Sequence, residues 1–406
     1  MTTNAALTPG AAKTPETTLR EVVEALAPME KLAGSEGESE AAEWIEARLN
    51  KAGVEARVEE ESFRDGFAGQ LATLAAASAA AGLVALNRWG RPLGFLGGAA
   101  AGALIADDVS NGPRLYRRLV AEEKTTWNVV AEIGPADAER TLVLLAHHDA
   151  ARTGRIFSQA GQRAIGDAAP GLIERADTSV PLWWLVLSGP LLVAAGAAAG
   201  SRKLTAAGSV LSAGAAASLA DIQRSPVVPG ANDNLSAVAV LVAVAEALRE
   251  KPLEGVRVVL ASCGAEEVLQ GGIHGFAKRH LAEMDRDRTW VLNLDTVGSP
   301  ELMLLEGEGE LVMEDYFDRG WRDLIARVAE REGIPIRRGM RAGASTDAVI
   351  PSRMRIPTAC IASMDEYKAL SNYHWPTDTP ENLNYPTVAC AADLSLAVAR
   401  ELDSSA

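Results

Sequence analysis

The sequence predicts an α/β protein with a mostly parallel, mixed sheet that is covered by helices on both faces. The first observation is that short apolar runs, typical of buried strands, alternate with helical patterns along the chain. The second is that several of these runs end on acidic residues or histidine. The 406 residues are 48% hydrophobic, which is enough for a large core without disulfides. Three cysteines are too few and too widely spaced for a disulfide framework or a thiolate zinc site: Cys263, Cys360 and Cys390.

Charge and the N-terminal sequence exclude two classes of protein. The net charge is −15 and there are no basic blocks, which argues against a nucleic-acid partner. Residues 1–18 lack the basic start and apolar core of a secretory signal. Their Thr, Pro and Ala content predicts a short disordered tail.

The expected elements follow in chain order. Residues 19–53 read as two helices that end near Gly53, and 54–63 alternate as a strand. Residues 235–250 are apolar nearly all round, which predicts a buried helix. Four apolar runs predict further strands: 141–146, 256–263, 290–295 and 356–362.

Two Ala-rich segments interrupt this pattern. Residues 66–106 and 178–220 each contain two long uncharged stretches around a short basic turn. We therefore expect two helical hairpins inserted into one globular domain. A membrane-spanning helix needs about 20 mostly apolar residues, and two of the stretches reach that length.

The hairpins are interpreted as transmembrane, giving a multi-pass protein in contact with the lipid bilayer. Each insertion would cross the membrane an even number of times, so all globular parts would stay on the same side of the membrane. Basic residues are more frequent in the globular flanks than in the turns, which favours a cytoplasmic catalytic domain. The alternative is a soluble cytoplasmic protein in which the hairpins are buried helices or dimerisation elements.

Acidic residues and histidines gather where the expected strands end. The run 141–146 ends at His147 and Asp149, and the run 256–263 leads into Glu266 and Glu267. Asp295 ends a third strand. Two loops contribute Asp233, in "PGANDN", and His374, in "NYHWPTDTPENL". Since ligands bind beyond the carboxyl ends of strands in open parallel sheets, we expect these side chains at one edge.

Such a set indicates a metal site. Carboxylates crowded at one edge repel each other, and divalent cations remove that cost. Two imidazoles and at least three carboxylates, without thiolates, suit Zn²⁺, with Co²⁺ or Mn²⁺ as alternatives. Five ligands exceed the needs of one catalytic zinc and suit two metals that share a carboxylate and a water.

With these motifs the chain resembles the co-catalytic zinc aminopeptidase family, which also includes glutamate carboxypeptidases and glutaminyl cyclases. The resemblance rests on His-x-Asp after a strand, Gly-Ala-Asn-Asp-Asn before a helix and Glu-Glu after a strand. An Asn-Leu-Asp strand end and Tyr-His-x-Pro-x-Asp near the C-terminus complete it. It implies a zinc exopeptidase fold formed discontinuously by 19–65, 107–177 and 221–402.

The resemblance implies a role for each residue. His147 and Asp295 would hold one zinc, Glu267 and His374 the other, and Asp233 would bridge them. Asp149 would orient His147. Glu266 would be the general base that activates the metal-bridging water.

The substrate-binding residues are less specified. The family uses a tyrosine to stabilise the oxyanion, and Tyr367 and Tyr373 are the candidates. Loop residues depart from the family pattern, as at Val268-Leu269-Gln270. This puts the substrate preference in doubt more than the metal ligands.

The predicted function is hydrolysis of peptide bonds by a metal-dependent exopeptidase, as an aminopeptidase acting on peptides. One alternative is a related zinc carboxypeptidase or amidohydrolase, although the short spacing from Glu267 to Asp295 leaves little room for the lid domain of those enzymes. The other is a non-catalytic membrane binding module on the same fold, which the intact ligand set and Glu266 argue against.

Overall fold

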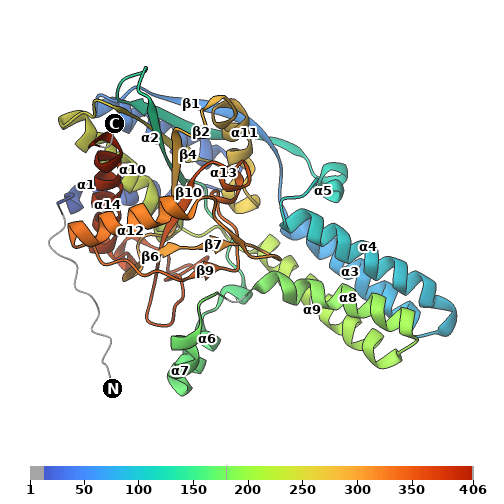
Figure 1. Ribbon diagram of the computed structural model, residues 1–406. Helices are drawn as coiled ribbons and strands as arrows, with labels where there is room; N and C mark the ends of the chain where they lie inside the picture. Colours follow the sequence, from blue (N-terminus) through green and yellow to red (C-terminus); the bar gives the residue numbers. More distant parts are fainter. Residues whose placement is uncertain (1–12, 180, 405–406) are drawn as a thin grey trace.

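A seven-stranded mixed sheet forms the centre of the computed structural model, which describes residues 13–179 and 181–404 (Figure 1). Its strand order is β1-β2-β4-β3-β5-β10-β6, and the four strands from β4 to β10 run parallel. The other three strands join the sheet through antiparallel pairs, β1 with β2, β2 with β4 and β6 with β10, so the sheet is mixed, as predicted. The strands are β1 Ala56–Arg64, β2 Glu123–Ile133, β3 Arg140–His147, β4 Val256–Cys263, β5 Thr289–Leu294, β6 Glu301–Leu305 and β10 Thr358–Met364.

Both faces of the central strands are buried because each strand alternates its side chains between two cores. Leu142 and Leu144 of β3 belong to the larger core, whereas Val143 and Leu145 belong to the smaller one. The helices that build the larger core are α1 Glu16–Leu26, α2 Glu36–Lys51, α10 Ser236–Glu250, α12 Arg319–Glu332 and α14 Tyr385–Ser404. The opposite face is covered by α11 Gly271–Arg279 and α13 Val349–Arg353.

Shorter elements complete the described chain. A three-stranded sheet consists of β7 Gly307–Glu308, β8 Glu314–Asp315 and β9 Arg341–Ala342. Three short helices are α5 Leu115–Val120, α6 Ala160–Ala168 and α7 Pro170–Arg175. Single turns are η1 Arg88–Gly90, η2 Arg155–Phe157, η3 Ala231–Leu235, η4 Glu266–Val268, η5 Leu281–Glu283 and η6 Pro380–Asn382.

The disordered tail predicted for residues 1–18 is too long at its C-terminal end. Residues 1–12 lie outside the described residues, but helix α1 already begins at Glu16. The backbone N–H and the hydroxyl of Thr14 both donate to Asp393 of helix α14, at 3.0 and 2.7 Å. These bonds tie the start of the helix to the globular part, which the composition of the segment did not reveal.

The two predicted hairpins are present, and they pack against each other as one four-helix bundle that projects from the globular part (Figure 1). Helices α3 and α4 form the first hairpin, and α8 and α9 form the second. The bundle helices are α3 Ala68–Ala85, α4 Arg91–Val109, α8 Leu182–Ala199 and α9 Arg202–Arg224.

Two of these helices continue beyond the predicted ends at residues 106 and 220. The extra turns carry acidic residues, which have partners in the globular part. Asp108 forms an ion pair of 2.7 Å with Arg117, and Asp221 accepts a bond of 2.8 Å from the backbone N–H of Arg155. These acidic residues end the apolar pattern of the sequence, but both helices continue past them.

Small residues allow the bundle helices to approach closely. A Cβ atom added at Gly189 would lie 2.5 Å from the backbone nitrogen of Ser212, and one at Gly98 would lie 2.7 Å from that of Ala194. The hydroxyl of Ser212 donates to that of Ser78 at 3.2 Å inside the bundle. Close contacts of small residues with hydroxyl hydrogen bonds are typical of helices that pack in membranes.

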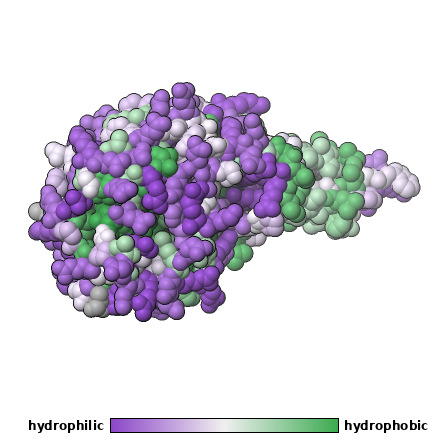
Figure 2. All heavy atoms as spheres, turned by 90° about the horizontal axis from the view of Figure 1, so that it is seen from above, coloured by the Kyte–Doolittle hydropathy of each residue, from purple (hydrophilic) through white to green (hydrophobic). Residues whose placement is uncertain are grey.

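The outer surface of the bundle is apolar, in contrast to the hydrophilic globular part (Figure 2). Among the described residues, four helical segments are long and apolar enough to cross a membrane. Three are in the bundle: Ala68–Ala85, Arg88–Val109 and Leu182–Ala199. The fourth, Ala231–Glu250, is 89% buried because it contains α10, the helix at the centre of the larger core.

Candidate metal centre

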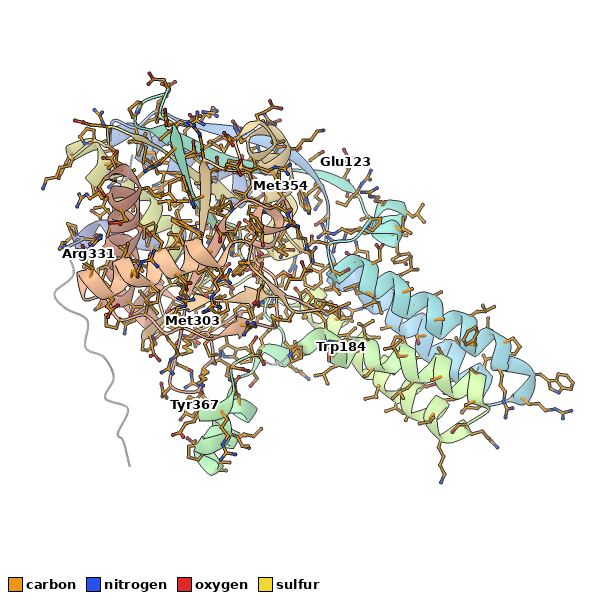
Figure 3. All side chains as sticks on the ribbon, viewed as in Figure 1. Glu123, Trp184, Met303, Arg331, Met354 and Tyr367 are labelled. Atoms are coloured by element: carbon orange, nitrogen blue, oxygen red, sulfur yellow. The ribbon has the colours of Figure 1, made fainter. Side chains whose placement is uncertain are left out.

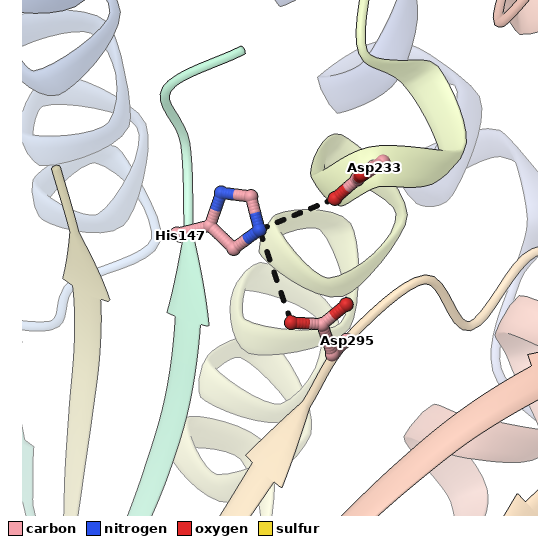
Figure 4. A group of neighbouring side chains, drawn as sticks. All are labelled: His147, Asp233 and Asp295. Atoms are coloured by element: carbon pink, nitrogen blue, oxygen red, sulfur yellow. Dashed lines mark ion pairs between the residues drawn. The ribbon is translucent and has the colours of Figure 1, made fainter. Parts of the chain in front are cut away.

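The carboxyl ends of the parallel strands deliver the first group of polar side chains. His147 is the last residue of β3, and Asp295 directly follows the neighbouring strand β5. Asp233 lies in η3, the turn that precedes α10 (Figure 4). Nε2 of His147 is 3.3 Å from Oδ1 of Asp233 and 3.9 Å from Oδ2 of Asp295. All three side chains are at most 13% exposed, so the group is enclosed by protein.

A second group shares Asp233 with the first. Nε2 of His374 lies 3.1 Å from Oδ2 of Asp233 and 3.0 Å from Oε2 of Glu267. One oxygen of Asp233 therefore faces each group. In both groups three ligand atoms lie within 4.8 Å of one another, which fits a metal ion. The two groups of ligand atoms share one carboxylate, that of Asp233.

Asp149 holds three neighbours in place. Its Oδ1 lies 3.4 Å from Nδ1 of His147, on the side of the ring opposite the metal group. The same carboxylate accepts the backbone N–H groups of Glu266 and Glu267, at 2.9 and 3.0 Å. Asp149 therefore orients an imidazole and also fixes the turn that carries both glutamates, which the sequence did not suggest.

The carboxylates have perturbed pKa values because they are buried together. Burial, opposed by His147 and reinforced by Asp233 and Glu267, raises the pKa of Asp295 to about 7. Burial also raises the pKa of Glu267, and that of Glu266 well above its ordinary value. Asp233 differs, because hydrogen bonds with both histidines outweigh burial and lower its pKa.

The two histidines respond in the opposite sense. Burial lowers the pKa of His374, but the charges and hydrogen bonds of Glu267 and Asp233 raise it to about 10. Burial likewise opposes a larger effect at His147, where Asp149 and Asp233 raise the pKa well above its ordinary value. Without cations, protons on the imidazoles therefore compensate part of the acidic charge. Divalent ions would take over that role.

The donor atoms fit zinc. Two imidazoles and three carboxylates surround the two sites, without a thiolate. Within the described part of the chain, Oε1 of Glu267 is buried without a hydrogen-bond partner, as is Nδ1 of His374. A buried carboxylate oxygen without a partner is costly, and a cation would relieve that cost.

Glu266 has the position of a proton acceptor beside the first group. Its Oε2 lies 4.0 Å from Nε2 of His147, and its side chain is 10% exposed. Its Oε1 accepts a hydrogen bond of 3.0 Å from the amide of Gln270. Because Glu266 contacts the group without belonging to either set of three, its carboxylate is available for proton transfer.

The structure brings only one of the two candidate tyrosines to the site. Tyr373 is partly buried, and its ring stacks on that of His374 with centroids 3.8 Å apart. Tyr367 was a wrong candidate, because its hydroxyl donates to Asp167 at 2.8 Å in an exposed region near α6 (Figure 3). The two tyrosines are close in sequence, but the loop between them turns away from the metal centre.

Asp378 is a residue of the site that sequence reasoning left without a role. Its carboxylate accepts the backbone N–H groups of Asn232 and Asp233, at 2.7 and 3.1 Å. It therefore holds the backbone of the shared ligand. The Tyr-His-x-Pro-x-Asp motif contained it, but its partner lies far away along the chain.

The comparisons with known proteins agree with this geometry. The profile of peptidase family M28 matches residues 217–399, just under half of the chain. The predicted resemblance to the co-catalytic zinc family is confirmed, and so is the class of enzyme, a zinc metallopeptidase. No curated protein matches the chain.

Solved structures share the fold at low sequence identity. An aminopeptidase from Aneurinibacillus sp. strain AM-1 is 15% identical, with a TM-score of 0.55 over 96% of this chain and 94% of that one. The zinc aminopeptidase BSAP from Bacillus subtilis is 15% identical, with a TM-score of 0.54 over 95% and 94%. A glutaminyl cyclase from Bacteroides thetaiotaomicron is 11% identical, with a TM-score of 0.57 over 96% and 99%. At these identities the likeness establishes the fold alone.

Proposed function

We propose that this zinc metallopeptidase, with its peptidase family M28 domain, is an aminopeptidase that uses two zinc ions. The observation that carries the proposal is Asp233, whose two oxygens lie 3.3 Å from His147 and 3.1 Å from His374. His147 and Asp295 would hold one ion, and Glu267 and His374 the other. Asp233 would bridge them.

Several residues of the chain have separate roles in the proposed hydrolysis. Two zinc ions, when bound, polarise the scissile carbonyl and lower the pKa of the attacking water. Glu266 accepts the proton of that water and delivers it to the leaving amine. Asp149 keeps His147 in its tautomer and holds the backbone of Glu266. Tyr373, beside His374, is the candidate donor to the oxyanion.

The test combines metal analysis with assays of aminoacyl anilides. Purified wild type is expected to hold two zinc ions per chain and to release aniline from N-terminal residues. Glu266→Gln should keep both ions and lose about 10²–10⁴-fold in kcat, which is the usual contribution of a general base. Metal-loaded wild type that cleaves none of the panel, or cleaves no faster than the variant, would refute the proposal.

The helical bundle is proposed to anchor the enzyme in a lipid bilayer, with the catalytic part on the cytoplasmic side. A helix of 18 residues is about 27 Å long, close to the thickness of the hydrocarbon core. Large apolar side chains are exposed on the bundle, among them Leu83, Leu96 and Leu185. The exposed basic residues Arg88, Arg202 and Lys203 lie at its far turns, where their long side chains would extend to the headgroups.

Membrane fractionation tests the anchor. The full-length protein should sediment with membranes and require detergent for release, whereas carbonate washing should leave it bound. A monodisperse protein in the supernatant without detergent would contradict the anchor. The aminopeptidase proposal would survive that outcome, because the metal centre does not include the exposed face of the bundle.

A further inference from the structure

Exposed apolar side chains on two segments outside the bundle lie at its base. The first segment is α5, in which Leu115, Leu119 and Val120 are exposed. At 84%, Leu119 is the most exposed large apolar side chain that the structure describes. The second segment is the loop between β7 and β8, in which Val312 and Met313 are exposed. We call these five residues the basal collar.

Both segments of the basal collar are fixed to the bundle through a neighbouring residue. Tyr116 of α5 and Leu311 of the loop pack against the apolar core that the bundle helices form at their base. The indole N–H of Trp184, in the first turn of α8, also donates to the backbone oxygen of Leu311 at 3.1 Å (Figure 3). Since α5 contacts α3 and α4 instead, the basal collar flanks the bundle beside both hairpins.

The apolar surface of the bundle therefore continues onto the globular part. In Figure 2 the bundle is apolar from the point where it leaves the globular part, and the basal collar adjoins that point. Contiguous exposed apolar surface marks sites of contact with proteins or membranes, and binding to a bilayer surface strengthens with the apolar area buried there. The net charge of −15 disfavours attraction to anionic headgroups, so apolar burial is the contact that fits a bilayer here.

A cavity of about 600 Å³ connects the metal centre with the same place. Glu267 and His374 line it on the side of the second metal group. Only three of its lining residues are exposed, namely Thr73 of α3, Val120 of α5 and Gln223 of α9. Exposed lining residues mark the opening of a cavity, and all three lie on helices at the base of the bundle. Because Val120 also belongs to the basal collar, the opening adjoins the basal collar.

We propose that the basal collar rests in the headgroup region of the bilayer, and that the metal centre therefore acts on peptides bound to the same membrane. The inference rests on the proposed aminopeptidase function and on the proposed anchor. A peptide held at the bilayer surface presents its N-terminus at the level of the opening and reaches the metal ligands through the cavity. Attachment of enzyme and substrate to one surface also raises their effective concentration. The substrate class is thus a free N-terminus close to the headgroups.

Site-specific fluorescence tests the position of the basal collar without a measurement of activity. All three native cysteines are buried, so a cysteine introduced at the surface can be labelled selectively. Leu119→Cys and Val312→Cys each place a dye in one segment of the basal collar. Ala47→Cys is the matched control, because Ala47 is exposed on α2, away from the bundle (Figure 1). In phosphatidylcholine vesicles, lipids with a spin-labelled headgroup should quench both dyes in the basal collar and leave the control dye unchanged.

Peptides of different reach test the substrate class. Each probe begins with the residue that wild type removes fastest from the anilide panel, followed by a flexible spacer and a palmitoyl chain in the vesicle. A spacer of 8 residues reaches at most about 28 Å, and one of 24 residues about 80 Å. The short-spacer peptide should be cleaved at least as fast as the long one, because the opening lies at the bilayer surface. Both should exceed the same peptide without palmitoyl about tenfold or more in kcat/KM.

The outcomes separate this inference from the two proposals on which it rests. Dyes in the basal collar that are quenched no more than the control dye would exclude its contact with the bilayer. Cleavage of the long-spacer peptide alone, or equal kcat/KM with and without palmitoyl, would exclude an opening that serves the membrane surface. Each of these results, in protein that stays in the vesicles and cleaves the soluble peptide, would overturn the inference and leave both proposals standing. Protein that leaves the vesicles would overturn the anchor, and protein inactive on the soluble peptide would overturn the aminopeptidase function, each together with the inference.

Discussion

The amide nitrogen of Gln270 donates a hydrogen bond of 3.0 Å to Oε1 of Glu266. The same nitrogen donates to the backbone oxygen of Ser345 at 3.0 Å, and the amide oxygen accepts from Asn111 at 2.8 Å. With three partners the amide cannot rotate freely. Gln270 therefore fixes one oxygen of Glu266, so that the other faces His147.

Gln270→Asn should lower kcat about tenfold with little change in KM or zinc content, because the shorter amide cannot reach Glu266. Asparagine tolerates the left-handed backbone of this residue, whose φ is 60°, so the fold should persist. Steady-state kinetics with metal analysis measure the effect. Gln162→Ala is the control, since that amide bonds the backbone oxygen of Tyr367 instead. Equal kinetics for the two variants would argue against a positioning role.

Metal stoichiometry should distinguish the shared ligand from the others. Asp295→Ala and His374→Ala each remove a ligand from one group, so each variant should keep about one zinc per chain. Asp233→Ala removes a ligand from both groups and should keep close to none. Elemental analysis after dialysis gives these numbers. Retention of two zinc ions by the Asp233 variant would contradict the bridging arrangement.

The buried ion pair between Asp108 and Arg117 should stabilise the junction of bundle and catalytic part. Both side chains are 1% exposed, and Arg117 also donates to the backbone oxygen of Val268 at 2.7 Å. Arg117→Met removes the nearer cation and leaves buried Asp108 with Arg114 alone, 3.9 Å away, which should cost up to about 3–5 kcal/mol. Chemical denaturation should show this loss, whereas Arg20→Met, in an exposed pair with Glu16, should cost less than about 1 kcal/mol. Similar losses of unfolding free energy in the two variants would show that the buried ion pair contributes no more stability than the exposed one.

Removal of the metal should reverse the response of stability to pH. In the metal-free protein the pKa values of Glu267 and Asp295 are raised above those of unfolded carboxyls, and those of both histidines are raised as well. A raised pKa in the folded state contributes stability that is present at low pH and lost as pH rises. The chelated protein should therefore melt several degrees higher at pH 5 than at pH 7.5. Zinc-loaded protein should show the opposite order, because protons compete with zinc for the ligands. If the melting temperature changed with pH in the same direction in both forms, the prediction would be wrong.

Much of the metal centre could be predicted, because its ligands follow from two local rules. Strand ends deliver His147 and Asp295 to one edge, and the turn before a buried helix delivers Asp233. The structure places all three together. The choice between Tyr367 and Tyr373 depended on the path of one loop, and nothing in the local sequence describes that path.

Contacts between distant segments were not predictable. The two hairpins pair because their glycines and alanines fit, but such surfaces are nearly uniform and their pattern does not specify a partner. Gln270 was recognised only as a departure from the family pattern, since its bond to Glu266 requires left-handed residues at Leu269 and Gln270. Helix ends beyond residues 106 and 220 depended on remote partners of Asp108 and Asp221.

The second hairpin occupies the chain between His147 and Asp233, two residues that must meet. Its base is closed by antiparallel contacts, in which Thr153 donates to Pro226 at 3.0 Å and Val228 donates to Ala151 at 2.9 Å. Until helices α8 and α9 pair, this stretch is a long open loop whose closure has an entropic cost. A newly synthesised chain would thus stay inert until its hairpin has folded. Assembly of the metal centre is then coupled to the folding of the second hairpin, although no described residue of that hairpin is a proposed metal ligand.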